Sequence, residues 1–528
     1  MNVMDSTTAG NPTSQASQRK LRTPEQVADE LQSLSGQLRQ LVPESAGQGK
    51  SFDQTERKVW QMVRKIGFEA MELFVSLQGD GDLGEHVNTE DGQQFVRSAK
   101  PAATIVRSIF GEHVFQQFTY SRGKNKTILL RPLSARMQLP KHRWSYLLQE
   151  FSQIFSVESA FNQAADNLQI VFGEKFSVDT LEQISQRMGV DADSFLDNLP
   201  VPSAEKEGEL LVASADCKGV PLVKQDVAKV AAFETAKKRP GNRRMATVTS
   251  VYSVDRHVRS AKSIVDALFR EEPESPIDGE PPTKRPEPQF KNTTAHFPTI
   301  EMDDEAEVPI SGIHEGMAWL ADQVQSRQGD DQPLIVLMDG QGSLWDTAAM
   351  HWGGDEQRTV EILDFLHVAV YVWEAAALFY DERSEKDAFT RERLLKLLHG
   401  EAAAVIRGLR RMGTLRKLSG EKRKDLMRIT GYLEKHQKRM RYDEYLHGGY
   451  PIASGVIEGA CRHLVKDRME RSGMRWTLEG ARSMLNVRAA FQSDHWDAFQ
   501  KQRVTRLSTE SHPHRNLIDD YKPLTLAC

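Results

Sequence analysis

The chain has 528 residues, of which 39% are hydrophobic and 27% are charged, and its formal net charge is −5. This length allows about three or four domains, and no apolar stretch is long enough to predict a membrane span. Three cysteines, Cys217, Cys461 and Cys528, lie far apart without a CxxC pair. This spacing argues against a disulfide framework or a cysteine zinc ribbon, and it predicts a reducing cytoplasm.

The N-terminal part of the chain predicts a short tail followed by a mainly helical region. Residues 1–22 are polar and rich in Ser, Thr and Gln, which predicts a disordered tail without a secretory signal. Apolar residues recur at helical spacing through most of 23–205. Within it, residues 104–131 alternate as strands do, with a turn near 122–126.

A helix-turn-helix is one interpretation of the segment that follows. Residues 158–172 and 178–188 predict two short helices separated by Gly173, and Ser177 is placed to cap the second. Such a pair can read DNA, but it is also the commonest form of helical hairpin. Both interpretations stay open, and we assign 23–205 to a DNA-binding region with a possible helix-turn-helix.

A change of pattern after residue 205 predicts the start of a sheet. Three short strands are predicted, at residues 209–215, 220–223 and 246–254. Asp216 ends the first strand, and Lys218-Gly219 predict a tight turn before the second. Residues 257–269 predict a helix. Residues 271–300 contain seven of the 22 prolines, which predicts an insertion without a packed core.

Helices and strands then alternate. The predicted elements are a helix at 310–325, buried strands at 334–338 and 359–363, and helices from 368 to 441 and from about 454. Asp339 and Asp364 directly follow the two strands. Neighbouring strands followed by strands with helical crossovers predict a mixed five-stranded sheet in an α/β core.

Three acidic residues stand where a metal site is expected. Asp216 and Asp339 end predicted strands, and Glu458 lies in the first turns of the last predicted helix. Carboxylates at strand ends are held rigidly yet face solvent, and carboxylate oxygens are the ligands that Mg²⁺ and Mn²⁺ prefer. Each residue also has a simpler interpretation, as a turn residue, a strand-end cap or an exposed helix residue.

Four segments of the chain resemble the Kra-type insertion-sequence transposases, in that family's order. They are SADCKGVP (214–221), VLMDGQGSLWD (336–346), EILDFLH (361–367) and GYPIASGVIEGACRHLVKDRMERSGM (449–474). Together the resemblance covers roughly residues 211–499. It implies a DDE-type catalytic core with an RNase H-like fold, related to Mutator-like transposases, in which Asp216, Asp339 and Glu458 are catalytic and bind Mg²⁺, with Mn²⁺ as a substitute. Cys217 stands where glycine is usual.

The resemblance also implies roles for further residues and a domain plan. Asp364 and His367 match an Asp/Cys-x-x-His motif that supports the site in related transposases, while a buried core histidine is the other interpretation of His367. The predicted plan is a core at 206–367, an all-α basic insertion at 368–449, the glutamate helix of the core at 450–500 and a C-terminal tail at 501–528.

Basic residues are concentrated near these elements. Residues 405–445 hold 13 Lys and Arg against 5 Asp and Glu, a local balance of +8. A stripe of this kind predicts phosphate contacts, while a solvated helix face is the alternative. Arg462 and Lys466 follow Glu458 at helical spacing and predict cations beside it. The predicted DNA-binding residues are Arg410, Arg411, Lys422, Arg423, Arg462, Lys466 and Trp476, of which Trp476 is either a base-stacking or a core residue.

We therefore predict a bacterial DDE transposase that cuts DNA and joins strands at the terminal inverted repeats of a mobile insertion sequence. Its expected partners are double-stranded DNA ends and target DNA, and we expect at least a homodimer on DNA, in the cytoplasm with the nucleoid. Two alternatives remain open: an inactive or domesticated DNA-binding relic, and an RNase H-like nuclease without strand transfer.

Overall fold

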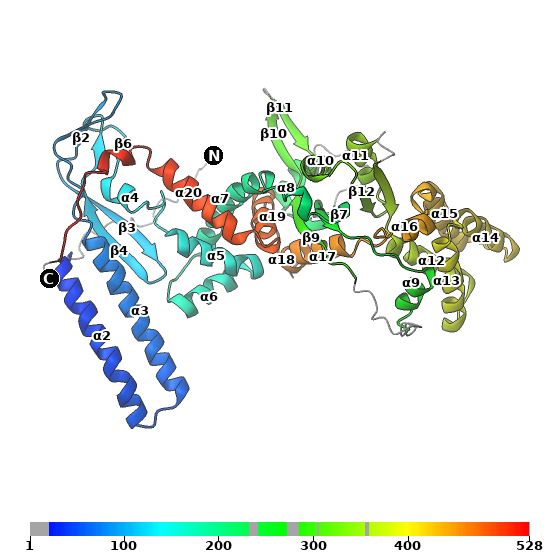
Figure 1. Ribbon diagram of the computed structural model, residues 1–528, viewed down its shortest axis with the longest axis horizontal. Coiled ribbons are helices and arrows are strands. Elements are labelled where there is room, and N and C mark those ends of the chain that lie inside the picture. The colour runs from blue at the N-terminus through cyan, green and yellow to red at the C-terminus, as the bar shows by residue number, and fades with distance from the viewer. Residues whose placement is uncertain are drawn as a thin grey trace, which may run out of the picture. The chain divides into compact units, whose positions relative to one another are not determined.

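The computed structural model describes residues 21–231, 241–271, 285–303, 306–353, 358–471 and 473–526. Nearly all of the predicted N-terminal tail, and Cys528, lie outside these ranges. The chain forms two compact units, residues 1–184 with 497–528 and residues 185–496 (Figure 1). Every helix in the described ranges is too short or too polar to cross a membrane.

The first unit begins with a long helical hairpin. Helix α2 (Pro24–Gly47) and helix α3 (Phe52–Ser76) pack against each other, as the helical spacing predicts. Each helix starts with a capping box, at Thr23 and at Ser51, in which the side chain accepts a hydrogen bond from the backbone of the third helical residue. Residues 48–51 separate the two helices.

Six strands follow the hairpin, more than the mainly helical prediction allowed. A four-stranded antiparallel sheet has the order β1-β2-β5-β6, and β3 and β4 form a separate hairpin. The strands are β1 (His86–Asn88), β2 (Gln94–Arg97), β3 (Ala102–Ser108), β4 (Gly111–Gln117), β5 (Tyr120–Ser121) and β6 (Ile128–Leu130). The strand-like alternation at 104–131 is confirmed, and β1 and β2 were missed because they are short and polar.

The predicted C-terminal tail is wrong for most of its length. Helix α20 (Trp496–Ser511) and the short helix η4 (Arg515–Ile518) occupy this part of the chain. Ile518 is 3% exposed and packs in one cluster with Phe95, Tyr120 and Leu130 of the four-stranded sheet. Isolated apolar residues in a polar segment gave no helical period, so this long-range packing left no local signal.

The helices before residue 205 agree with the predicted pair. Four helices complete this part of the chain: α4 (Pro132–Arg136), α5 (Tyr146–Glu158), α6 (Phe161–Phe172) and α7 (Val178–Asp197). Gly173 ends α6 with a φ of +71°, and the Ser177 hydroxyl accepts a hydrogen bond from the Thr180 amide at 3.2 Å. The first helix of the pair, α6, begins three residues later than predicted, because α5 continues to Glu158. Whether α6 and α7 read DNA stays a prediction.

A mixed five-stranded sheet forms the centre of the second unit, as predicted, in the order β13-β12-β7-β8-β9. Strands β7, β8 and β9 are antiparallel, and β12 and β13 run parallel to β7. The strands are β7 (Leu210–Pro221), β8 (Arg243–Val254), β9 (Gln289–His296), β12 (Leu334–Met338) and β13 (Thr359–Leu363).

Two predictions within this sheet are wrong. The expected turn at Lys218-Gly219 is the interior of one continuous strand, because β7 pairs with β8 over all twelve residues. The proline-rich segment 271–300 contains strand β9, which pairs with β8, and part of a hairpin formed by β10 (Thr299–Asp303) and β11 (Ala306–Ile310). Residues 272–284 of this segment lie outside the described ranges.

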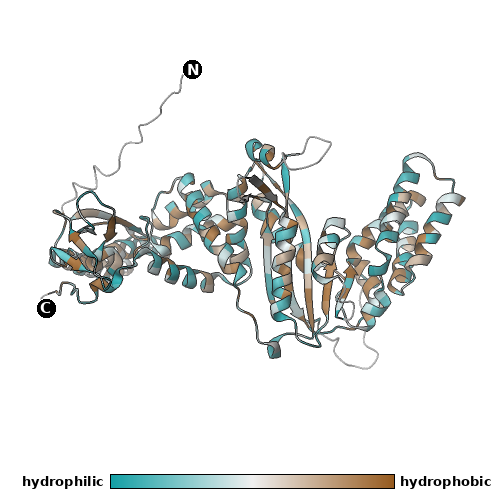
Figure 2. Cartoon of the chain, turned by 90° about the horizontal axis from the view of Figure 1, so that it is seen from above, coloured by the Kyte–Doolittle hydropathy of each residue, from teal (hydrophilic) through white to brown (hydrophobic). Residues whose placement is uncertain are grey.

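Helices cover the sheet and extend its core. The helices next to the strands are α8 (Lys224–Ala231), α9 (Ala261–Leu268), α10 (Gly312–Arg327), α11 (Gly342–Trp352), α17 (Gly455–Ala460), α18 (Asp467–Met469) and α19 (Leu478–Gln492). The predicted insertion contains α12 (Phe365–Phe379), α13 (Arg383–Leu398), α14 (Ala402–Leu415), α15 (Gly420–Lys435) and α16 (Tyr442–His447). Ile335 and Ile362 of the sheet share one hydrophobic cluster with Val372, Leu409 and Leu433 of the insertion. The insertion is therefore packed onto the sheet rather than separate from it, and Figure 2 shows hydrophobic residues running through both.

Candidate functional site

Three aspartates lie in one row across the parallel strands. The register pairs Leu334 with Leu211 and with Thr359. Continued along the strands, the same offsets align Asp339 with Asp216 on one side and with Asp364 on the other. Residues in register on parallel strands point to the same side of the sheet, so the three carboxylates share one edge of the site.

The expectation that Asp216 ends its strand is wrong. It lies inside β7, opposite Val248 of β8, while the neighbouring strands β12 and β13 end at this level. Its Oδ1 accepts a hydrogen bond from the Cys217 amide at 2.6 Å, and its Oδ2 accepts one from the Cys461 thiol at 3.3 Å. Asp216 is thus held by two cysteines.

Asp364 is the most deeply buried acid of the row. It caps helix α12, where its Oδ1 accepts a hydrogen bond from the Leu366 amide at 2.6 Å, and its Oδ2 accepts one from the Ser454 amide at 3.1 Å and another from the Ser454 hydroxyl. Burial acts to raise its pKa, but the ion pair with His367 and the hydrogen bonds from Ser454 hold that pKa below its ordinary value. Asp364 is therefore ionised although its side chain is 0% exposed.

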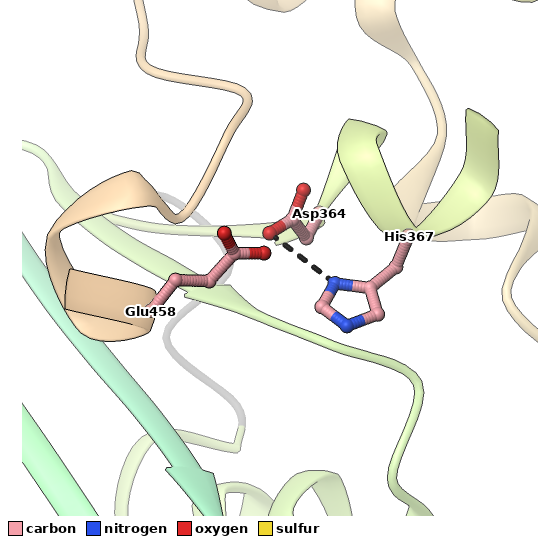
Figure 3. Close-up of side chains that lie close together, drawn as sticks. All are labelled: Asp364, His367 and Glu458. Carbon is pink, nitrogen blue, oxygen red and sulfur yellow. Dashed lines mark ion pairs between the residues drawn. The ribbon is translucent and has the colours of Figure 1, made fainter. Parts of the chain in front are cut away.

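His367 and Glu458 complete a group with Asp364 that can hold a metal ion (Figure 3). One ligand atom from each of the three side chains lies within 4.8 Å of the others. Nδ1 of His367 lies 3.4 Å from Oδ2 of Asp364. The ion pair with Asp364 is the largest cause that raises the pKa of His367 to about 9, and the charges of Asp339 and Glu458 add to it. His367 is therefore a partly exposed imidazole paired with Asp364, and not a neutral core histidine.

The predicted triad is not gathered as closely as this group. Among the described residues, the ligand atoms of Asp364, His367 and Glu458 come within 4.8 Å of one another, whereas those of Asp216, Asp339 and Glu458 do not. The two aspartates still act electrostatically on the group. Burial raises the pKa of Asp339, and the charges of Asp216 and Asp364 raise it further. Burial also raises the pKa of Glu458, with contributions from Asp364 and Asp216.

The expectation that Arg462 and Lys466 keep Glu458 ionised is wrong. After α17 the helix widens into a π-helix, η3 (Cys461–Lys466), which shifts the following side chains relative to Glu458. Both cations are exposed, and Nε of Arg462 lies 3.9 Å from Asp467. The cation that lowers the pKa of Glu458 is His367. Local sequence spacing gave no sign of the wide turn.

The π-helix also presents Cys461, which belongs to a stripe of apolar residues at helical spacing, Ile457, Cys461 and Leu464. Cys461 is 5% exposed, and its thiol donates to Asp216. Burial and the charge of Asp216 raise the pKa of this thiol far above its usual range. The stripe of buried residues was the available signal, because that side of the helix had to face the sheet that carries Asp216.

Of the two interpretations of Trp476, base stacking and a core position, the structure agrees with the core position. It is 6% exposed, and its indole nitrogen donates to the Met469 carbonyl at 3.2 Å. The guanidinium of Arg468 lies 4.8 Å from the centre of its ring. A ring enclosed in this way offers no face for stacking a base.

The basic stripe of the insertion is exposed, and one of its cations, Arg410, is paired with an acid of the same chain. Arg410 donates two hydrogen bonds to Glu434, at 3.1 and 2.7 Å, which link α14 to α15. Arg411, Lys422 and Arg423 are exposed. Arg410 and Arg423 also line a hollow of about 490 Å³ together with Lys417. The stripe can therefore meet an anion with at least three cations.

The insertion touches the turn that carries Asp339. A side chain at Gly340 would place its Cβ 2.1 Å from the ring of Tyr432 on α15, so only glycine fits there. The ring of Tyr432 stacks on Tyr371 of α12 at 3.9 Å, which fixes its position. Asp339 itself accepts a hydrogen bond from the Gln341 amide at 2.9 Å. The position of the second aspartate therefore depends on helix α15.

Comparisons of the sequence with protein-family models and with curated proteins find no match.

Proposed function

We propose that this chain is a metal-dependent DNA transposase of the Kra type with an RNase H-like core. The observation that carries the proposal is the convergence of four carboxylates and one imidazole at one edge of the mixed sheet. Asp216, Asp339 and Asp364 form the row, and His367 and Glu458 lie beside Asp364. The charges of Asp216 and Asp364 raise the pKa of Asp339 and of Glu458, and acids crowded in this way favour a bound cation over a purely structural role.

The donor atoms fit a divalent metal ion. Asp364 and Glu458 supply carboxylate oxygens, which suit Mg²⁺ and Mn²⁺. The imidazole of His367, once the metal ion displaces its proton to solvent, suits Mn²⁺ better than Mg²⁺. A divalent ion bound there supplies positive charge that stabilises the attacking and leaving oxygens of a phosphodiester exchange. We therefore expect activity with Mg²⁺ and higher activity with Mn²⁺.

The residues of the chain itself hold the acids in place for this chemistry. Ser454 and the Leu366 amide fix Asp364, the Gln341 amide fixes Asp339, and the Cys461 thiol fixes one oxygen of Asp216. These contacts leave few rotamers open to the acids, which favours a preorganised site. We extend the proposed catalytic set accordingly, from Asp216, Asp339 and Glu458 to include Asp364 and His367.

The remaining parts of the proposed function concern DNA. We propose that the exposed cations of α14 and α15 bind the DNA backbone and that α6 and α7 contribute to recognising the terminal inverted repeats. DNA as substrate places the protein with the nucleoid. An enzyme that joins two ends also requires at least two copies of the chain on one DNA complex.

A strand-cleavage assay on a labelled element end tests the proposal. Wild-type protein should cut the end in Mg²⁺ or Mn²⁺ and join it to target DNA, and Asp339→Asn should reduce both activities at least about 100-fold. Full activity of Asp339→Asn would overturn the proposal. Cleavage without joining would favour the nuclease alternative, and tight DNA binding without cleavage would favour the relic.

A further inference from the structure

A pocket in the first unit is lined by basic side chains. It is formed by strands β3 and β6, the loop at residues 139–143 and the C-terminal segment, which returns to this unit beside β6 and α4 (Figure 1). Its volume is about 290 Å³, near the lower limit of roughly 300–1,000 Å³ for ligand pockets, which suits a small ligand group. None of the described residues that line it is acidic, and its basic residues are Arg131, Lys141, His142, Arg143, His512 and His514.

Three of these cations have no acidic partner within the described ranges of the chain. Arg131, Lys141 and Arg143 are exposed, and none of them forms an ion pair with an Asp or Glu there. The Arg143 guanidinium lies 4.9 Å from the centre of the Trp144 ring, which restricts its movement. The sequence around them is equally one-sided, because residues 113–149 contain seven Lys and Arg and no Asp or Glu. The pocket therefore carries positive charge that the chain leaves uncompensated locally.

The surroundings of His512 show that this positive charge is crowded. Because a carbonyl can only accept, Nε2 of His512 donates its hydrogen bond to the Leu139 carbonyl at 2.8 Å. Burial lowers the pKa of His512, the bond to Leu139 acts against this, and the charges of Arg515 and Lys141 lower the pKa further. Cations that disfavour the protonation of a neighbouring histidine favour an anion between them.

Two hydroxyl groups of the pocket keep a hydrogen to donate. The Leu133 and Ser134 amides donate to Oε1 of Gln117 at 3.0 and 3.2 Å, so the other end of this side chain, Nε2, is the donor. It donates to the Thr104 hydroxyl at 2.8 Å and to the Ser134 hydroxyl at 2.7 Å. Both hydroxyls are acceptors in these bonds, and no described residue accepts the hydrogen that each of them carries. Gln117 is 0% exposed and Ser134 is 6% exposed, so the fold fixes this arrangement.

We propose that this pocket binds one phosphate group of a DNA backbone. Phosphate oxygens accept hydrogen bonds and donate none, so they match uncompensated cations and hydroxyls that are left only to donate. The apolar residues Ile105, Leu129 and Leu139 line the same pocket and offer contact to the adjoining sugar. Exposed Lys124 and Lys126, just before β6, continue the positive charge along the chain, as a strand with repeated phosphates requires. The choice of DNA as the source of the phosphate rests on the proposed function.

The pocket differs from the possible helix-turn-helix of the same unit in what it recognises. A phosphate contact fixes the position of the protein on the backbone and carries no sequence information, whereas α6 and α7 would read bases. Variants of the pocket should therefore weaken binding to an element end and to an unrelated duplex of the same length by the same factor. A loss confined to the element end would overturn the assignment to the backbone.

Fluorescence anisotropy of the full-length chain with labelled duplex DNA tests the pocket. Arg131→Ala/Lys141→Ala should weaken binding at least about 10-fold and flatten the log–log dependence of affinity on salt by about 0.9, for one lost phosphate contact. Arg39→Ala/Lys65→Ala removes the same two charges from exposed positions of α2 and α3 and should bind as the wild type does. An equal loss in the two variants would reduce the effect to net charge and overturn the inference.

A hydroxyl variant tests the pocket without changing its charge. Thr104→Val removes one donor, so it should weaken binding about 3-fold with an unchanged salt dependence, and Thr104→Ser should restore the wild-type affinity. Full affinity of Thr104→Val would overturn the role of the hydroxyl. Circular dichroism checks that the fold is kept, and if Thr104→Val unfolds, the variant of the exposed Arg131 and Lys141 decides alone.

The result can be separated from that of the proposed function. A pocket variant that binds DNA as tightly as the wild type would overturn the inference and leave the proposed enzyme standing. A wild type that binds duplex DNA through this pocket but does not cut it would support the inference and overturn the enzyme. A wild type that binds inorganic phosphate in the pocket but no duplex DNA would overturn both.

Discussion

The two helical hairpins of the chain, α14–α15 in the second unit and α2–α3 in the first, differ in how completely they bury their apolar residues. In α14–α15 the inner faces are completely buried, as at Leu409, Ile429 and Leu433. They join the cluster that also contains the sheet residue Ile335. In α2–α3 most of the apolar residues at helical spacing are only half-buried, as at Leu38.

The solvent-facing surfaces of the two hairpins differ in polarity. The outer face of α14–α15 is charged and carries the Arg410–Glu434 pair, whereas one side of α2–α3 carries exposed Val42 and Trp60. A helical hairpin that completes its burial within the chain can present a charged surface to a ligand. One that does not complete it leaves apolar side chains exposed to solvent.

The largest expected difference is in core packing. Leu433→Ala should cost about 2–5 kcal/mol in the free energy of unfolding, because it opens a cavity in a fully enclosed core. Leu38→Ala should cost about 1 kcal/mol, because its side chain is already partly solvated. Chemical denaturation of the two variants measures the difference, and equal costs would break the contrast between the hairpins.

The contact of α15 with the turn that carries Asp339 predicts the next effect. Gly340→Ala forces a methyl group into the ring of Tyr432 and should lower strand cleavage at least about 30-fold. Adding Tyr432→Ala should restore part of that activity by removing the collision. Gly431→Ala on the same helix is the control, since its surroundings in the described chain are open. An additive double variant would show that the contact does not position Asp339.

The charged surface of α14–α15 predicts a salt effect on DNA binding. Neutralising Arg410, Arg411, Lys422 and Arg423 together should flatten the log–log dependence of affinity on salt by about 0.9 for each lost phosphate contact. We expect about three lost contacts, because Arg410 already pairs with Glu434. Neutralising Lys58 and Lys65 on α3 should leave the slope unchanged. An equal change in both variants would remove the distinction between the two surfaces.

The smallest expected effect is shared by the two hairpins. Gly36 on α2 and Gly408 on α14 each stand inside a helix, and no described atom lies within 4 Å of the point that a Cβ would occupy there. Replacing either by alanine should stabilise the protein by about 0.5–1 kcal/mol, because glycine loses more backbone freedom on folding. Thermal unfolding measures this gain, and a loss at Gly36 alone would point to a close partner on α2.

Sequence patterns predicted the elements whose signal is local. The apolar run at Leu334–Met338 predicted a buried strand, and the structure has β12 there. The pattern failed where pairing partners decide, as at Lys218-Gly219, which resembles a turn but lies inside β7 because β8 accompanies it along its whole length. Strand β9 was hidden because the prolines near it dominated the composition of its segment.

The site shows the same division. Asp339 and Asp364 could be anticipated because they directly follow buried strands, whereas Asp216 joins their row from inside β7. Glu458 was found by resemblance. The resemblance placed Asp364 and His367 at the site of Glu458. That these three lie closer together than Asp216, Asp339 and Glu458 could not be anticipated, because it depends on how α17 is placed. Tyr432 gave no signal at all, since its contact with Gly340 joins residues 92 positions apart in the sequence.

The most direct measurement of the central claim is Mn²⁺ binding followed by electron paramagnetic resonance, without DNA. The wild-type chain should bind Mn²⁺, and Glu458→Gln and His367→Ala should each weaken binding at least about 10-fold while the circular dichroism spectrum is unchanged. Variants that bind Mn²⁺ as tightly as the wild type would contradict the assignment of Asp364, His367 and Glu458 as the metal-binding group.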